Sequence, residues 1–192
     1  MFPNPKNIQV WSSWLTIVLL VFGDWLSKTL VRTNLSPGNS ISILGDILKI
    51  TYFQNYVGFS WWVPELPSWS KVILQGLFLF VILAAYPVYL FYVNQRRHSF
   101  WVDLAFIGIV ASLTGHLLND WFLPYTVDFI QIYHSPCANF ADIYSYVAIN
   151  ALIIEIVQIN QSQNHNRTEF RQWAKERKTL IKEFIEYYRW RR

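Results

Sequence analysis

Residues 72–93 have the sequence VILQGLFLFVILAAYPVYLFYV, in which no side chain is charged. A helix needs about 20 mostly apolar residues to cross hydrocarbon about 30 Å thick. The segment is long enough and apolar enough to meet this requirement. We therefore expect it to cross a membrane as a helix.

Three further long apolar stretches lie on either side of this segment. They are residues 10–31, which contain Asp24 and Lys28; residues 100–118, with Asp103 and His116; and residues 143–159, with Glu155. Together with 72–93 they predict four transmembrane helices, although 143–159 is short for a span.

The composition agrees with a membrane protein. Of 192 residues, 53% are hydrophobic and 15% are charged, whereas soluble domains contain about 25% charged residues. Ten Trp and eleven Tyr belong to the residue types that favour the membrane–water interface. The single cysteine, Cys137, excludes an intrachain disulfide and a cysteine metal cluster, and we expect it to pack as a small apolar residue.

Lys and Arg are unevenly distributed among the connecting segments. The link at 119–138 contains neither, whereas the turn at 94–98 contains Arg96 and Arg97 and the tail from residue 164 is dense in both types. Such residues accumulate on the cytoplasmic side of a membrane. We therefore expect both termini in the cytoplasm and the two longer links on the outer side.

The first outer link predicts a small β-hairpin. Residues 40–44 (SISIL) and 47–53 (ILKITYF) are β-rich and flank Gly45-Asp46, which is a two-residue turn signal. Such a hairpin could form a platform on the bilayer surface.

The tail at 167–192 spaces its apolar residues three and four apart. It is either an amphipathic helix on the anionic inner leaflet or a solubilising cytoplasmic extension. The predicted fold class is thus an all-α membrane protein with four transmembrane helices, an outer hairpin and an amphipathic C-terminal helix. We expect a transmembrane domain at 1–160 and a basic cytoplasmic tail at 161–192.

Ionisable residues inside apolar spans are costly and need an explanation. Asp24 and Lys28 are four residues apart, so they share one helix face and can pair. They form either a polar cluster that faces a site or an ion pair that only neutralises itself.

Two more carboxylates, Asp128 and Asp142, lie close to the expected outer boundary. If they approached each other, one would stay protonated and the other ionised. An aspartic protease uses such a pair, because one carboxylate activates water and the other polarises the scissile carbonyl. Asp142 could equally be an acidic residue that the N-terminal dipole of the fourth helix favours.

A series of short motifs resembles the lipoprotein signal peptidase family between about residues 23 and 149. That family carries, in order, Asp-x-x-Ser-Lys, an Asn before a Gly-rich turn, Gly-Asn-x-x-Asp-Arg, Val-Asp-Phe and Asn-x-Ala-Asp. The corresponding segments here are Asp24-Trp25-Leu26-Ser27-Lys28, Asn55 with Gly58-Phe59-Ser60-Trp61, Val127-Asp128-Phe129-Ile130 and Asn139-Phe140-Ala141-Asp142. Each motif is short, but their order and spacing together are specific.

The resemblance implies an intramembrane aspartic endopeptidase, with Asp128 and Asp142 as its catalytic pair. The residues that would bind substrate or support the site are Asp24, Lys28, Asn55, Gly58, His116, Asn119 and Asn139. The substrates would be prolipoproteins, cut before a diacylglyceryl-modified cysteine. The resemblance further implies a monomer among the lipids of a bacterial inner membrane, with its site facing outward. It implies no metal, no organic cofactor and no nucleic-acid partner.

The third motif departs from the family pattern. Here Gly115-His116-Leu117-Leu118-Asn119-Asp120 replaces Asn by His116, Asp by Asn119 and Arg by Asp120. His116 could supply a donor or a positive charge to the site, or it could be a buried neutral side chain. The departure leaves open a catalytically weak or inactive paralogue that still binds lipoproteins or signal peptides. A small channel or transporter subunit is a third alternative, but no repeat or broken-helix signal favours it.

Overall fold

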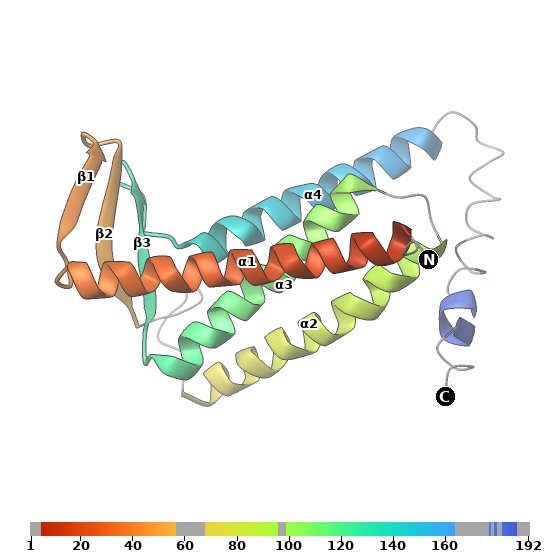
Figure 1. Ribbon diagram of the computed structural model, residues 1–192, viewed down its shortest axis with the longest axis horizontal. Coiled ribbons are helices and arrows are strands. Elements are labelled where there is room, and N and C mark those ends of the chain that lie inside the picture. The colour runs from red at the N-terminus through yellow and green to blue at the C-terminus, as the bar shows by residue number, and fades with distance from the viewer. Residues whose placement is uncertain are drawn as a thin grey trace.

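The computed structural model describes residues 5–56, 68–95, 99–163, 177, 179 and 182–187. Four long helices dominate it, with three strands gathered at one end (Figure 1). The elements are α1 (Pro5–Asn34), β1 (Ser40–Leu44), β2 (Leu48–Asn55), α2 (Ser68–Gln95), α3 (Phe100–Phe122), β3 (Thr126–Ile132) and α4 (Phe140–Gln163).

All four helices are long and apolar enough to span a membrane, which confirms the predicted spans. The spanning segments are Ile8–Asn34, Trp69–Asn94, Phe100–Phe122 and Phe140–Gln161. Their outer faces expose large apolar side chains, among them Leu19, Phe80 and Ile153. Such faces are unfavourable in water and favourable in lipid. The chain is therefore a multi-pass membrane protein.

Helix α3 is the centre of the bundle, since it packs against α1, α2 and α4. One buried cluster joins α1, α2 and α3, and in it the rings of Tyr89 and Phe106 stack with centroids 4.0 Å apart. Small residues let α3 and α4 approach closely: a Cβ atom on Gly108 would lie 2.8 Å from Ala148 Cβ and 2.8 Å from the Tyr144 carbonyl oxygen. Close packing at small residues is a main source of helix association in lipid.

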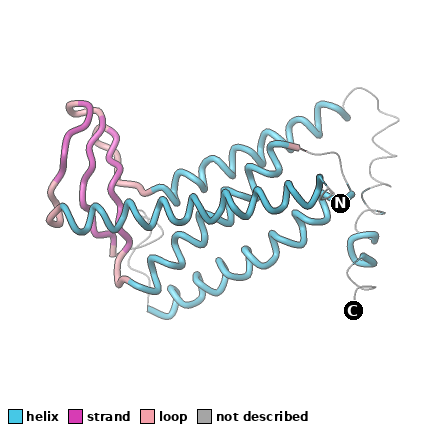
Figure 2. Tube along the Cα trace, viewed as in Figure 1, coloured by secondary structure: helices cyan, strands magenta, loops and turns pink. Residues whose placement is uncertain are grey.

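The three strands form one antiparallel sheet in the order β1-β2-β3, at the end of the bundle opposite the N-terminus (Figure 2). The predicted hairpin is confirmed as β1 and β2, with Gly45 at φ 55° in its turn. The sequence analysis did not predict β3, which pairs with β2 so that Asn55 faces Thr126 and Phe53 faces Asp128. Val127 and Phe129 anchor β3 because their side chains are buried against the end of α1.

Part of what the sequence predicted lies outside the described residues. This holds for Gly58, for the basic turn with Arg96 and Arg97, and for most of the tail. Within the tail, residues 182–187 are helical, and Phe184 contacts Phe91 of α2 with ring centroids 5.1 Å apart. The division into domains at residue 160 remains a prediction.

The contact of α3 with α4 predicts that Gly108→Ala destabilises the protein. The added methyl group must push α4 away, and overpacking of this kind costs about 1–3 kcal/mol. Gly76→Ala in α2 is the matched control, because nothing lies within 4 Å of the added atom. Thermal unfolding in detergent should show a lower Tm for Gly108→Ala alone. Equal Tm values for the two variants would contradict the predicted close contact.

Candidate active site

Asn139 and Asp142 form a capping box at the start of α4. The Asn139 side-chain oxygen accepts a hydrogen bond from the Asp142 backbone N–H at 3.2 Å, and Asp142 Oδ2 accepts one from the Asn139 backbone N–H at 2.8 Å. This reciprocal pattern satisfies two free N–H groups at a helix N-terminus. It also fixes the position of the Asp142 carboxylate.

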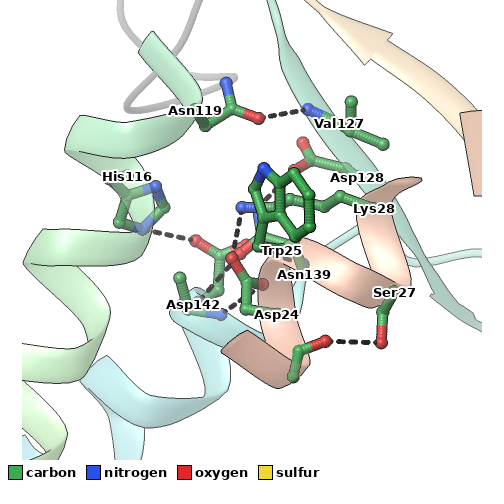
Figure 3. Close-up of polar contacts among 12 residues, drawn as sticks. Asp24, Trp25, Ser27, Lys28, His116, Asn119, Val127, Asp128, Asn139 and Asp142 are labelled. Atoms are coloured by element: carbon green, nitrogen blue, oxygen red, sulfur yellow. Dashed lines mark hydrogen bonds and ion pairs between the residues drawn. The ribbon is translucent and has the colours of Figure 1, made fainter. Parts of the chain in front are cut away.

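The same asparagine reaches Asp128 on β3. Asn139 Nδ2 donates to Asp128 Oδ1 at 2.7 Å, and Asn55 Nδ2 on β2 donates to Asp128 Oδ2 at 3.0 Å. Both oxygens of Asp128 therefore accept hydrogen bonds from neutral amides. Figure 3 shows Asp128 and Asp142 on either side of Asn139, so the predicted pair does come together.

The two carboxylates have different surroundings. Asp128 is 4% exposed, and this burial raises its pKa to about 6. The negative charge of Asp142 acts in the same direction, while the hydrogen bonds from Asn55 and Asn139 and the charge of Lys28 act against it. The side chain of Asp142 is 33% exposed, and its Oδ1 lies 3.4 Å from His116 Nε2. Asp142 is thus the carboxylate that water reaches more easily.

Asp24 and Lys28 form a buried ion pair beside these groups, with Lys28 Nζ 2.7 Å from Asp24 Oδ2. The other oxygen of Asp24 accepts a hydrogen bond from the Ala141 backbone N–H at 3.2 Å. This contact ties α1 to the first turn of α4, next to Asp142. The pair is therefore more than self-neutralising, because it also supports the helix end that carries the second carboxylate.

Gly115 makes room for this contact. A Cβ atom at residue 115 would lie 3.1 Å from Asp24 Oδ2 and 3.2 Å from Ala141 Cβ. A small open cleft lies beside it between α1 and α3. The residues that line the cleft are Val21, Asp24, Trp25, Lys28, Thr29, Arg32, Gly115, Leu118, Asn119, Phe122 and Leu123.

Two residues of the altered third motif, Asn119 and His116, make different contacts in the site. Asn119 Nδ2 donates to the Tyr125 carbonyl at 2.9 Å, and Asn119 Oδ1 accepts from the Val127 N–H at 3.4 Å. Asn119 thus connects the end of α3 to β3 and places Asp128 without touching it. His116, one turn earlier, reaches the pair directly through Asp142.

Sequence reasoning did not foresee the backbone donors and acceptors of the site. The Ala141 N–H and the Tyr125 carbonyl are peptide groups, so their residue types gave no signal. The sequence analysis also gave no role to Asp103, which lies at the end of the bundle opposite the sheet. Asp103 there accepts hydrogen bonds from Gln9 and Tyr89.

Comparison with known proteins identifies the family of the chain. The family model Peptidase_A8, described as signal peptidase (SPase) II, matches residues 16–158, which include every described residue of the site. The chain belongs to the signal peptidase II family. Membership makes this signal peptidase II homologue a protease of the membrane.

Individual relatives are similar at modest identity. The lipoprotein signal peptidase of Shewanella pealeana is 28% identical over 148 residues, which is 74% of this chain and 84% of the relative. That of Clostridioides difficile is 28% identical over 145 residues, or 74% and 93%. A solved bacterial membrane enzyme has the same fold, with a TM-score of 0.68 and 22% identity over 81% of this chain and 92% of its own.

The burial of Asp24 and Lys28 in this signal peptidase II homologue predicts that Lys28→Met strongly destabilises it. Loss of one partner leaves an uncompensated buried charge, which costs about 3–5 kcal/mol. The double variant Asp24→Asn/Lys28→Met should recover much of the loss, because neither charge remains. Unfolding in detergent measures both. A double variant no more stable than Lys28→Met would argue against the ion pair as the cause.

The raised pKa of Asp128 predicts that the folded protein loses stability as pH rises. The ordinary value is 3.8 and the folded value about 6, so between these values the folded state retains a proton that the unfolded state has lost. Asp128→Asn removes this dependence, so its stability relative to the wild type should be about 1–3 kcal/mol higher at pH 8 than at pH 4. Unfolding measured at both pH values tests this. An equal difference at the two values would contradict the assignment.

Proposed function

We propose that the chain is an intramembrane aspartic endopeptidase that removes signal peptides from diacylglyceryl-modified prolipoproteins. The main observation in support of this proposal is the set of hydrogen bonds of Asn139. Its side chain binds Asp128, and both its backbone and its side chain bind Asp142. It holds together two carboxylates with unequal surroundings. Such inequality favours one protonated and one ionised member, as acid–base hydrolysis of a peptide requires.

In the proposed reaction Asp142 is the general base and Asp128 the general acid. The Asp142 carboxylate takes a proton from water while the oxygen of that water bonds to the scissile carbonyl carbon. Asp128 gives its proton to the carbonyl oxygen, which yields a neutral geminal diol. Collapse of the diol returns a hydroxyl proton to Asp128, and Asp142 gives its proton to the leaving amine. Both carboxyl groups end as they began, so the reaction uses no metal or organic cofactor.

The position of the pair suits a substrate that is itself embedded in lipid. Asp128 is on the sheet and Asp142 at the first turn of α4, where the spanning segment Phe140–Gln161 begins. A signal-peptide helix can enter from the bilayer while its diacylglyceryl group stays in lipid. In this proposal that end of the bundle faces outward and both termini are cytoplasmic, and the distribution of Lys and Arg supports this orientation.

The family names of the relatives support the substrate class and, with it, a bacterial inner membrane as the location. In this proposal residues 1–160 form the peptidase, which works as a monomer among membrane lipids. Residues 161–192 form the basic cytoplasmic tail. Asn55, Asn139, Asp24 and Lys28 support the pair by the contacts described above, and Gly58 remains a proposed supporting residue from the sequence motif.

A second candidate is a weak or inactive paralogue that binds lipoproteins or signal peptides. The observation in its favour is the altered third motif, in which Asp120, which interacts with His116, stands where the family pattern has Arg. Against it stands the arrangement of Asp128 and Asp142, both present and both held by hydrogen bonds. Cleavage assays separate these two candidates.

The proposal predicts that Asp128→Asn and Asp142→Asn each lower cleavage by about 10³-fold or more, because either change removes an essential acid–base group. The assay follows release of the signal peptide from a diacylglyceryl-modified prolipoprotein by protein purified in lipid. Asp46→Asn is the matched control, since its side chain is 84% exposed and pairs only with Lys49 in the described part of the chain. It should cleave like the wild type.

Three outcomes matter. Loss in both variants with full activity of the control supports the catalytic pair. Normal cleavage by either variant would contradict the assignment of that residue as catalytic. Substrate binding without cleavage by the wild type favours the inactive paralogue.

A further inference from the structure

His116 occupies a place between two acidic side chains. Its Nε2 atom lies 3.4 Å from Asp142 Oδ1 on α4, and its own side chain is 20% exposed. Asp120 follows one turn later on α3 and interacts electrostatically with it. The ring of Phe78 on α2 lies against the imidazole with centroids 6.3 Å apart. Packing thus fixes a titratable side chain beside one member of the pair.

The hydrogen bonds of the two carboxylates set His116 apart from the other donors. Asp128 accepts from the side-chain amides of Asn55 and Asn139, which never carry charge. Asp142 accepts from a backbone N–H on one oxygen and faces His116 with the other. Several donors lie at hydrogen-bonding or ion-pairing distance of Asp128 or Asp142. Within residues 5–56, 68–95 and 99–163, His116 is the one among them that can gain a full positive charge.

Several charged groups from other elements lie around His116. From α1 comes the Asp24–Lys28 ion pair. From α2 comes Lys71, which interacts with Asp120. Asp142 and Asp128 complete the set from α4 and β3. Histidine side chains change charge between about pH 5 and 8, whereas Lys stays charged there.

We propose that His116 is a positioning residue that holds Asp142 ionised as the general base, through the contact of its Nε2 atom with Asp142 Oδ1. The idea rests on the proposed aspartic mechanism and adds to it. In the family pattern the third motif carries a permanent cation, Arg, where this chain has Asp120. Here His116, one turn earlier on α3, makes the contact with Asp142, and Asp120 interacts with His116.

The test is the pH profile of kcat/KM for His116→Asn and His116→Gln, which keep a donor but cannot become cationic. Without the positive charge Asp142 is easier to protonate, so the acidic limb should move to higher pH by about one unit. On the acidic limb the variants should cleave about tenfold more slowly than the wild type at the same pH. The change should appear in kcat with little change in KM, since His116 acts through Asp142 and not on the substrate.

His134→Asn is the matched control. His134 is exposed on the loop after β3, so its substitution should leave the pH profile of kcat/KM unchanged.

A merely structural His116 would give a different result. The rate would then fall at all pH values without displacement of either limb, and that outcome overturns the proposal. Infrared difference spectroscopy of the carboxyl groups supplies a readout without substrate. Titration of Asp142, assigned by its loss in Asp142→Asn, should occur at higher pH in His116→Asn than in the wild type. If Asp142 shows this difference between the wild type and His116→Asn but the wild type does not cleave, the proposed function fails. The influence of His116 on Asp142 is then still supported.

Discussion

The candidate site depends on the hydrogen bonds of one fully buried asparagine, Asn139. Its backbone and side chain cap α4 together with Asp142, and its remaining side-chain donor holds Asp128. A buried amide that lost these partners would cost about 1–3 kcal/mol for each unsatisfied group. The interactions that begin the fourth helix are therefore the same interactions that bring the two carboxylates together.

The remaining contacts keep the sheet and the helices in register around Asn139. Asp24 of α1 binds the backbone of α4, and Asn119 of α3 binds the strand that carries Asp128. Gly115 lets α1, α3 and α4 meet at this level.

The sequence by itself determined the features that depend on local spacing. Four apolar stretches predicted four spans because the thickness of hydrocarbon sets the length of a helix. Asp24 and Lys28 pair as predicted because residues four apart share one helix face. The turn at Gly45-Asp46 predicted the hairpin of β1 and β2 for an equally local reason. The motif series also named the two carboxylates, although it could not show how they meet.

Only the tertiary structure decided which distant residues share the site. Strand β3 was missed because its partner β2 lies more than seventy positions away in sequence, and no local pattern encodes that pairing. The same pairing brings Asn55 to Asp128, and the packing of α3 on α4 brings His116 to Asp142. These contacts follow from how the apolar faces of separate elements pack together. The sequence supplied the carboxylates and the imidazole of the candidate site, and packing determined their neighbours.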